Sequence, residues 1–331
     1  MSQVDIVIVN WNAGVQLRRC LNSIASAMHS VRIGMVVVVD NNSKDGSADN
    51  VEHLNLPLHV IRNSTNRGFG AACNQGARVC QSPYLLFLNP DTEVESTSLS
   101  VPLQFLESNR NRDVGACGIQ LVNATGEVSR SCARLPSPGN LLANALGLPQ
   151  IAPAYFRGIH LSEWSHDATK DVDHVIGAFY FIRRELFDQT RGFDERFFVY
   201  LEDLDLSHSV IRLGKRIVYL TSAKAFHEGG GTSSQVKAQR LFYSRRSRIQ
   251  YSRKHFSLIQ TLLVAAATLL VEPMLMSVRA IIRRSPRELY QTTYGFLMLW
   301  ADLANCLRSH PDAVSSVPNV SVSNSTTSKV A

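Results

Sequence analysis

Three acidic residues follow an aromatic residue in the segment Tyr200-Leu-Glu-Asp-Leu-Asp205. A carboxylate at a reaction centre can accept the proton of an attacking hydroxyl group, which is the chemistry of general base catalysis. The same acids would also complement the dipole of a helix that begins here and runs to Leu213. By charge alone the helix interpretation is the better one, so a catalytic role for Asp203 needs support from the rest of the chain.

A second group of polar residues occurs in four short segments, each directly after an apolar run. The segments are Asn10-Trp-Asn12, Asp40-Asn-Asn-Ser-Lys-Asp-Gly46, Asn66-Arg-Gly-Phe-Gly70 and Asn89-Pro-Asp91. Taken singly, each is an ordinary loop, because Asp and Asn cap helices and Gly and Pro form turns. If the apolar runs are strands of one parallel sheet, however, their carboxyl ends border the crevice where such sheets bind ligands.

The elements that must position these segments alternate along the first ninety residues. Strands are expected at 4–9, 35–39, 58–62 and 84–88, with helices at 15–27 and 70–80. The run at 35–39 has no polar alternation, which is typical of a strand covered on both faces. The pattern predicts an α/β fold with a Rossmann-like, doubly wound sheet.

The middle of the chain is less regular. We expect a strand and hairpin over 114–122 and 127–134, an irregular segment over 135–170, which contains four prolines, and strands over 175–183 and 216–220. The irregular segment would suit a mobile wall on the acceptor side of a site.

The ordered motifs resemble the family 2 glycosyltransferases of the GT-A fold, over roughly residues 3–256. The resemblance is carried by the four polar segments above and by motifs further along the chain. These are Gly177-Ala-Phe179, Gly192-Phe-Asp-Glu195, Phe198-Val-Tyr-Leu-Glu-Asp-Leu-Asp-Leu206 and the loop from His227 to Gly231. The residues of Asn89-Pro-Asp91 and of the acidic motif are similar to the corresponding motifs of a rhamnosyltransferase-like subgroup. The resemblance implies a mixed sheet and an inverting sugar transfer from a nucleotide-sugar donor.

The resemblance also assigns roles to residues of this chain. It implies that Asp203 is the catalytic base, with acceptor contacts from Gly177, Tyr200, Glu202 and Asp205. The implied donor-binding residues are Asn10, Asn12, Asp40, Asn42, Asn66, Arg67, Gly68, Asn89 and Asp91. Arg183 and Arg184 are candidate phosphate partners near the acidic cluster.

The resemblance further implies a divalent metal, Mn²⁺ or Mg²⁺, because a cation stabilises a departing nucleoside diphosphate. Asp91 and His227 are the expected ligands. The family's Asp-x-Asp is Asn89-Pro-Asp91 here, so one carboxylate remains and Asn89 offers a neutral oxygen. An imidazole ligand favours manganese over magnesium. The alternative for His227 is a loop histidine held beside Glu228.

The carboxyl-terminal third combines basic and apolar segments. Residues 240–255 interleave arginines with aromatic residues, and an apolar run begins at Leu258. Since Glu272-Pro273 interrupts this run, we expect an interfacial or re-entrant helix rather than one of the ~18 to 20 residues that spanning requires. The alternative is an amphipathic helix packed on the core. A second such helix is expected over 289–307, and the basic flanks place both at the cytoplasmic face.

We therefore expect a catalytic domain over 1–234, a helical membrane-associating region over 235–308 and a disordered tail over 309–331. The catalytic domain would have a nucleotide-sugar half to about residue 95 and an acceptor half over 96–234. The basic segment favours an anionic lipid or a diphosphate over a nucleic acid, since an apolar segment follows it.

Composition narrows the cellular setting. The chain carries a net charge of +7, and its six cysteines have no zinc-knuckle or dithiol spacing. Because the first residues lack the features of a signal peptide, we expect a cytoplasmic enzyme at the inner face of the cell membrane. The expected reaction transfers L-rhamnose from dTDP-L-rhamnose to a glycan or polyprenyl-diphosphate-linked acceptor.

Three other classes remain as alternatives. An NAD(P)-binding Rossmann oxidoreductase is disfavoured because the first loop lacks the glycine fingerprint. A membrane-associated nucleic-acid-binding protein would explain only the basic helix. A silent sugar-nucleotide binder is disfavoured by the acids Asp91 and Asp203.

Overall fold

The computed structural model describes residues 2–49, 51, 54–229 and 236–307. The predicted disordered tail, residues 309–331, lies outside the described residues. The strands are β1 (Gln3–Asn10), β2 (Arg32–Asp40), β3 (Leu58–Arg62), β4 (Tyr84–Leu88), β5 (Thr92–Val94), β6 (Val114–Val122), β7 (Cys132–Ala133), β8 (Lys170–Val172), β9 (His174–Val175), β10 (Phe179–Arg183) and β11 (Arg216–His227). The α-helices of the catalytic part are α1 (Val15–Ala27), α2 (Phe69–Val79), α3 (Ser96–Glu107), α4 (Pro138–Ala145), α5 (Leu148–Ile151), α6 (Arg184–Gln189) and α7 (Glu202–Arg212).

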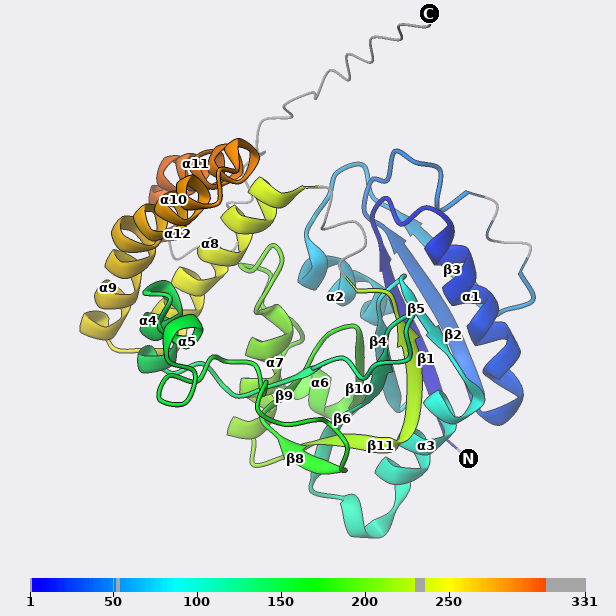
Figure 1. The fold of residues 1–331 in the computed structure, drawn as a ribbon. Helices are drawn as coiled ribbons and strands as arrows, with labels where there is room; N and C mark the ends of the chain where they lie inside the picture. The colour runs from blue at the N-terminus through cyan, green and yellow to red at the C-terminus, as the bar shows by residue number, and fades with distance from the viewer. Residues whose placement is uncertain (1, 50, 52–53, 230–235, 308–331) are drawn as a thin grey trace, which may run out of the picture.

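One mixed sheet organises the catalytic part (Figure 1). Its strand order is β3-β2-β1-β4-β10-β6-β11-β5, and β8 pairs with β11. The strands β3, β2, β1 and β4 run parallel, whereas β10 is antiparallel to both of its neighbours. This confirms the prediction of a doubly wound, mixed α/β sheet and brings the ends of β1, β2 and β4 to one edge.

Both faces of the sheet are buried, as the unbroken apolar runs predict. Along β1, Ile6 and Ile8 face one core with α1 and α3, while Val7 and Val9 face the other with α2, α6 and α7. Because successive side chains of a strand point to opposite faces, a strand covered on both faces must be apolar at every position.

Two expectations for the middle of the chain are corrected. The hairpin over 127–134 is reduced to the two-residue strand β7 and an isolated bridge between Val122 and Val128. The segment over 135–170 contains the helices α4 and α5. Ser137 caps α4 and Pro138 occupies its first turn, so the prolines begin helices here rather than prevent them.

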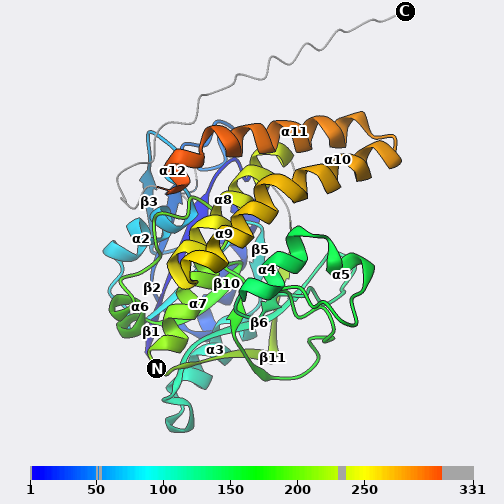
Figure 2. The ribbon, with the colours of Figure 1, turned by 90° about the vertical axis from the view of Figure 1, so that its left-hand side faces the viewer.

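The remaining helices form a layer beside the catalytic part (Figures 1 and 2). This helical layer comprises α8 (Lys237–His255), α9 (Leu258–Ala266), the π-helical turn η4 (Ala267–Val271), α10 (Glu272–Ile282), α11 (Pro286–Ala301) and α12 (Leu303–Leu307). Phe242 and Ile249 of α8 pack against Phe296 and Leu299 of α11. At Gly295 a Cβ atom would lie 2.9 Å from the carbonyl oxygen of Ala238, so glycine permits the close approach of α11 to α8.

The expected break at Glu272-Pro273 does not occur. Residues Leu258–Ile282 form one continuous helix, 25 residues long and apolar enough to cross a membrane by length and composition. Proline has no N–H to donate to the carbonyl four residues earlier, which is that of Leu269. The indole Nε1 of Trp300 donates to this oxygen at 3.1 Å. A contact from α11, distant in sequence, therefore satisfies a carbonyl of the π-helical turn next to Pro273.

A buried carboxylate joins the apolar helix to α8. Nη1 of Arg248 donates to Oε2 of Glu272 at 2.6 Å, and Nε of Arg245 donates to Oε1 at 3.0 Å. The Oγ of Thr268 also accepts a hydrogen bond from Arg248. Since two guanidinium groups share one carboxylate, the buried cluster depends on Glu272 for its charge balance.

Replacing Glu272 should therefore destabilise the helical layer. Glu272→Gln leaves two largely buried guanidinium groups without an anion, and breaking such a pair lowers the free energy of unfolding by about 3–5 kcal/mol. Urea denaturation measures the change. Glu288→Gln, at a half-exposed position of α11, is the control. Equal stability of the two variants would show that the cluster does not hold the layer in place.

Candidate active site

A cavity of about 1430 Å³ lies between the carboxyl ends of the central strands and the helical layer. The sequence-predicted residues that line it are Asn12, Asn42, Asn66, Gly68, Asn89, Asp91, Gly177, Tyr200, Glu202, Asp203 and His227. Residues from both predicted halves of the catalytic domain thus share one cavity.

The loops after β1 and β2 are joined beneath the cavity floor. Nδ2 of the fully buried Asn10 donates to Oδ1 of Asp40 at 2.8 Å and to the hydroxyl groups of Ser43 and Ser47. Asn10 and Asp40 do not line the cavity. The structure thus places these two predicted donor-binding residues under the loops that form the surface, where they hold the loops together.

The neighbouring asparagines form the surface itself. Asn12 and Asn42 line the cavity and adopt left-handed backbone conformations, with φ of 51° and 67°. Asn tolerates this region better than most residues, which explains its use at both positions. The side-chain oxygen of Asn12 accepts a hydrogen bond from the backbone N–H of Lys44 at 2.7 Å, so the two loops brace each other.

The third loop is held by Asn41, which is not among the predicted site residues. Its side chain donates to Oδ1 of Asn66 and to the carbonyl of Gly68, and its oxygen accepts from the backbone of Arg67. The Arg67 side chain is exposed and does not line the cavity, contrary to the expectation of a donor contact. At Gly68, where φ is 85°, a Cβ atom would lie 2.4 Å from the Phe198 carbonyl oxygen.

Asp91 and His227 are brought together by strand pairing. Asp91 precedes β5 and His227 ends β11, and in the antiparallel register Thr92 lies opposite His227. Nε2 of His227 is 3.4 Å from Oδ1 of Asp91, and the two side chains are 12% and 11% exposed. A carboxylate and an imidazole that face one cavity at this distance fit two ligands of a manganese ion. Within the described residues no third His, Cys, Asp or Glu completes a cluster.

Asp203 opens the first turn of α7. Its Oδ2 accepts the backbone N–H of Gly177 at 2.7 Å, and its Oδ1 accepts the N–H of Leu204 at 2.8 Å. The side chain is 19% exposed and lines the cavity. Gly177 therefore orients Asp203, and a Cβ atom there would lie 3.2 Å from Oδ2 of Asp203.

A buried histidine stands behind Asp203. Nε2 of His174 lies 3.6 Å from Oδ2 of Asp203, and Nδ1 of His174 is 2.9 Å from Oγ of Ser207, which also contacts the hydroxyl of Tyr180. Burial lowers the pKa of His174, so its ring is neutral near pH 7. His174 is not predicted by the sequence, because a single histidine in a short strand gives no periodic or spacing signal.

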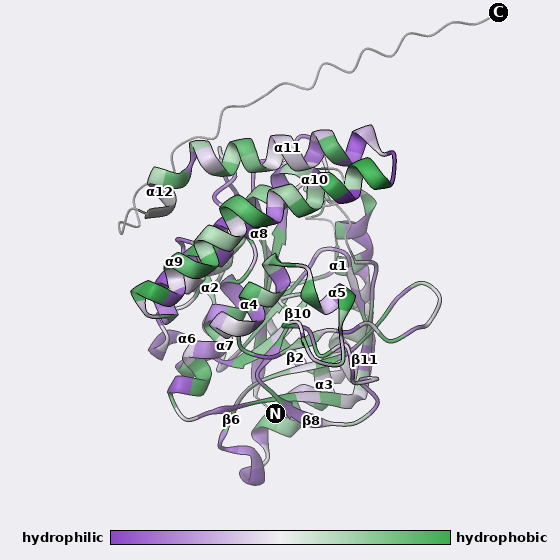
Figure 3. Ribbon diagram, turned by 60° about the vertical axis from the view of Figure 1, so that its left-hand side comes forward, coloured by the Kyte–Doolittle hydropathy of each residue, from purple (hydrophilic) through white to green (hydrophobic). Residues whose placement is uncertain are grey.

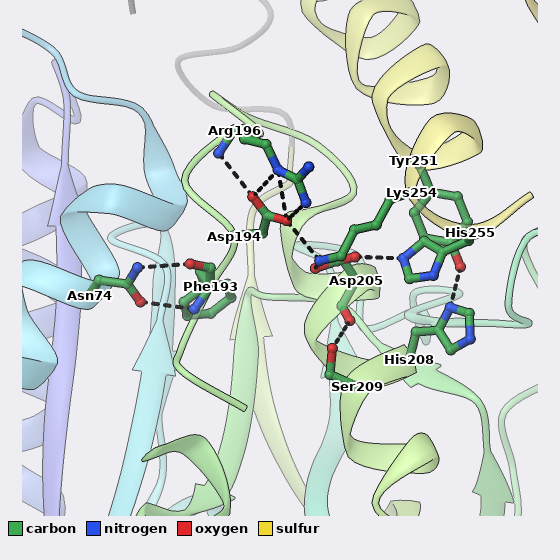
Figure 4. A network of polar contacts seen from close by, with 10 residues as sticks. All are labelled: Asn74, Phe193, Asp194, Arg196, Asp205, His208, Ser209, Tyr251, Lys254 and His255. Carbon is green, nitrogen blue, oxygen red and sulfur yellow. Dashed lines mark hydrogen bonds and ion pairs between the residues drawn. The ribbon is translucent and has the colours of Figure 1, made fainter. Parts of the chain in front are cut away.

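Asp205 has a different environment from the expected acceptor contact. It is buried and does not line the cavity. Its carboxylate accepts a hydrogen bond from Nζ of Lys254 at 2.7 Å and lies 2.7 Å from Nε2 of His255 (Figure 4). Lys254 also pairs with Asp194. Burial would raise the pKa of Asp194, but its hydrogen bonds with Arg196 and Lys254 lower that pKa below its ordinary value. Asp205 thus fastens the last turn of α8 to α7.

The two candidate phosphate partners lie elsewhere. Arg183 pairs with Tyr84 in the sheet register, at the amino end of β4, and its guanidinium donates to the carbonyls of Val114 and Leu106. Arg184 pairs with Asp188. Neither lines the cavity. That prediction is wrong, because β10 runs antiparallel and carries its last residues away from the site.

Two family models match the chain. Glycosyl transferase family 2 matches residues 5–146, and Glycosyl transferase family group 2 matches residues 154–305. The chain belongs to the family 2 glycosyltransferases. The comparisons support neither the oxidoreductase nor the nucleic-acid-binding alternative.

Curated relatives of this glycosyltransferase include rhamnosyltransferases. It is 25% identical over 249 residues to an N-acetylglucosaminyl-diphospho-decaprenol L-rhamnosyltransferase of Mycobacterium tuberculosis. The match covers 72% of this chain and 80% of the relative. It is 26% identical over 153 residues to the rhamnosyltransferase WbbL of Escherichia coli, covering 45% of this chain and 54% of that one.

Solved structures share the fold. GalNAc-T7 with UDP, GalNAc and Mn²⁺ matches with a TM-score of 0.56 and 13% identity, covering 92% of this chain and 58% of that chain. Residues 1–349 of TarS from S. aureus, in complex with UDP-GlcNAc, match with a TM-score of 0.52 and 18% identity. The match covers 90% of this chain and 81% of that chain. The fold is that of GT-A glycosyltransferases, as expected.

In this glycosyltransferase the carboxyl group of Glu202 is buried and has a raised pKa. Its side chain is buried, and its Oε2 has no hydrogen-bond partner within the described structure. Burial and the neighbouring Asp203 raise the pKa of Glu202 well above its ordinary value. The carboxyl group therefore tends to keep its proton in the folded protein.

Replacing Glu202 by glutamine should change how stability depends on pH. The unfolded chain ionises Glu202 in the ordinary carboxyl range, whereas the folded protein holds the proton to higher pH, so the free energy of unfolding falls as the pH rises above that range. Glu202→Gln removes this contribution. The variant should gain stability relative to the native protein between about pH 5 and pH 8. Thermal unfolding across that range measures the difference.

Glu185→Gln, at an exposed position of α6, is the control and should follow the native protein across the range. A constant difference between Glu202→Gln and the native protein would contradict the raised pKa.

Proposed function

We propose that this glycosyltransferase moves L-rhamnose from dTDP-L-rhamnose to a saccharide carried on a polyprenyl diphosphate, with inversion at the anomeric carbon. The choice of donor and acceptor is supported by the names of the two rhamnosyltransferase relatives. The observation that carries the reaction class is the position of Asp203, which lines the same cavity as Asp91 and His227.

In the proposed reaction the acceptor hydroxyl attacks the anomeric carbon from the face opposite the nucleotide. The new C–O bond forms as the bond to the diphosphate breaks, and the diphosphate leaves with the electron pair. Asp203 accepts the hydroxyl proton, and the N–H of Gly177 keeps its carboxylate directed into the cavity. A divalent cation held by Asp91 and His227 would supply positive charge for the leaving group.

The enzyme is proposed to act at the inner face of the cell membrane, with its apolar helix in the plane of the interface. The ribbon of α9 and α10 is coloured largely hydrophobic (Figure 3). Large apolar side chains of residues 258–282 are exposed. They are Leu258, Ile259, Leu262, Leu263, Leu270, Val271, Met274, Leu275, Val278, Ile281 and Ile282. We call these eleven residues the apolar stripe.

The opposite face of the same helix is tied to α8. The hydroxyl of Thr261 donates to the carbonyl of Ser252 at 3.0 Å, and Glu272 binds the two arginines of α8. Crossing a bilayer would expose this buried ion cluster to hydrocarbon, which is costly. Basic residues at both ends of the helix, including Arg253 and Arg284, suit an anionic lipid surface. If the helix lies in the plane of the interface, its apolar stripe contacts lipid while its opposite face stays packed against α8.

The reaction is tested by turnover of a panel of dTDP- and UDP-sugars with a prenyl-diphosphate-linked saccharide, with and without Mn²⁺ or Mg²⁺. We expect metal-dependent transfer from dTDP-L-rhamnose. Asp203→Asn should lower kcat by about 10²- to 10⁴-fold and leave donor binding intact, since the variant loses only its base.

Asp188→Asn, which removes an exposed carboxylate outside the cavity, is the control. Full activity of Asp203→Asn would eliminate this residue as the base. Equal transfer from dTDP- and UDP-sugars would eliminate the donor assignment, and retention of the anomeric configuration in the product would eliminate inversion.

The membrane proposal is tested by flotation with vesicles that contain phosphatidylglycerol. The native protein should float with the vesicles, and the double variant Leu262→Glu/Met274→Glu should remain in the soluble fraction, because charges on the apolar stripe oppose its burial in lipid. Leu213→Glu, an exposed apolar position at the end of α7, is the control. Flotation of all three proteins alike would rule out the apolar stripe as the contact.

A further inference from the structure

The wall of the cavity opposite the sheet is strongly basic. It is formed by α8, α10 and α11, whereas the donor loops and Asp203 lie on the other side. The cationic residues of this basic wall are Lys237, Arg240, Arg245, Arg246, Arg248 and Arg279. Only two acidic residues from these helices and their ends, Glu288 and Asp302, line the cavity with them.

The ion pairs leave this wall with excess positive charge. Asp302 balances Arg246, with Nε and Oδ2 2.7 Å apart. Glu272 must balance both Arg245 and Arg248, so this largely buried cluster retains one positive charge. An uncompensated charge at a partly buried site is costly unless a counter-charge approaches it.

Two further arginines contribute charge that no carboxylate offsets. Across the described ranges, Arg240 of α8 and Arg279 of α10 are exposed and have no acidic group within ion-pair distance. Both side chains line the cavity. Guanidinium groups bind phosphate oxygens through paired N–H donors, so a wall of this composition fits a diphosphate.

The apolar stripe identifies which diphosphate is the better fit. α10 carries Arg279 on the cavity wall and Met274, Val278 and Ile282 on the exposed apolar face. A single helix thus presents cations to the cavity and hydrocarbon to the outside. A ligand that combines a diphosphate with a long hydrocarbon chain matches both surfaces, whereas a nucleotide diphosphate matches only the first.

We propose that Arg240 and Arg279, supported by the Arg245–Glu272–Arg248 cluster, bind the diphosphate of the lipid-linked acceptor. The prenyl chain then leaves the cavity along α10 toward the apolar stripe, and the saccharide extends toward Asp203. This inference rests on the proposed function, because it assigns the acceptor subsite of the same cavity.

The test compares two acceptors that carry the same saccharide, one on a short prenyl diphosphate and one as an uncharged alkyl glycoside. In Arg240→Ala/Arg279→Ala the KM for the diphosphate acceptor should rise at least tenfold, since charged hydrogen bonds to phosphate are lost. The KM for the nucleotide sugar and turnover of the alkyl glycoside should stay within about twofold. Arg240→Lys/Arg279→Lys should recover part of the loss.

Arg212→Ala/Lys215→Ala is the charge-matched control, because it removes two positive charges outside the cavity. A rise in the KM for the nucleotide sugar, with the acceptor KM unchanged, would assign the arginines to the donor and overturn the proposal. Unchanged KM values for both substrates would overturn it as well.

A binding experiment keeps this test separate from catalysis. Farnesyl diphosphate should bind the native protein, and its affinity for Arg240→Ala/Arg279→Ala should fall at least tenfold, whereas farnesol should not distinguish the two proteins. If the native protein binds farnesyl diphosphate in this way but transfers no sugar, the proposed reaction fails while the subsite stands. Equal affinity of both proteins for farnesyl diphosphate would show that Arg240 and Arg279 do not bind the diphosphate, even if sugar transfer is observed.

Discussion

The buried carboxylate of Asp205 is the interaction on which the arrangement of the site depends. By contacting Lys254 and His255, it binds the end of α8 to the beginning of α7. The helical layer is thereby fixed beside the sheet and becomes a wall of the cavity. Asp203, two residues earlier, lies about 200° away around a helix of 3.6 residues per turn and faces the cavity. One helical turn thus holds a structural acid and a candidate base.

The same region stores backbone strain. Tyr200 and Leu201 both have positive φ, at 70° and 67°, although neither residue favours the left-handed region. Such conformations persist where surrounding contacts determine them, and they are frequent at functional sites. Here Ser247 of α8 donates to the carbonyl of Val199 at 2.8 Å, just before the strained pair. The helical layer therefore stabilises the loop that starts α7 and directs Asp203.

The sequence predicts the sheet and the cavity lining better than the contacts between distant segments. The unbroken apolar runs of β2 and β4 reflect burial on both faces, a local pattern with one structural cause. The bonds of Asn10 to Asp40 and Ser43 could not be predicted, because they need the spatial neighbourhood of two strands. Trp300, 27 residues after Pro273, donates to the carbonyl of Leu269, and no local rule could reveal this contact.

The environment of Asp203 also explains how a carboxylate can remain available as a base inside a partly enclosed cavity. A charged His174 would attract the carboxylate and lower its capacity to accept a proton. Burial lowers the pKa of His174, so the ring beside Oδ2 is neutral near pH 7. Two backbone N–H groups, from Gly177 and Leu204, then fix the carboxylate without adding a full positive charge. Positive charge is concentrated instead on the far wall of the cavity, at Arg240 and Arg279, and within the described residues no cation of that wall lies within ion-pair distance of Asp203.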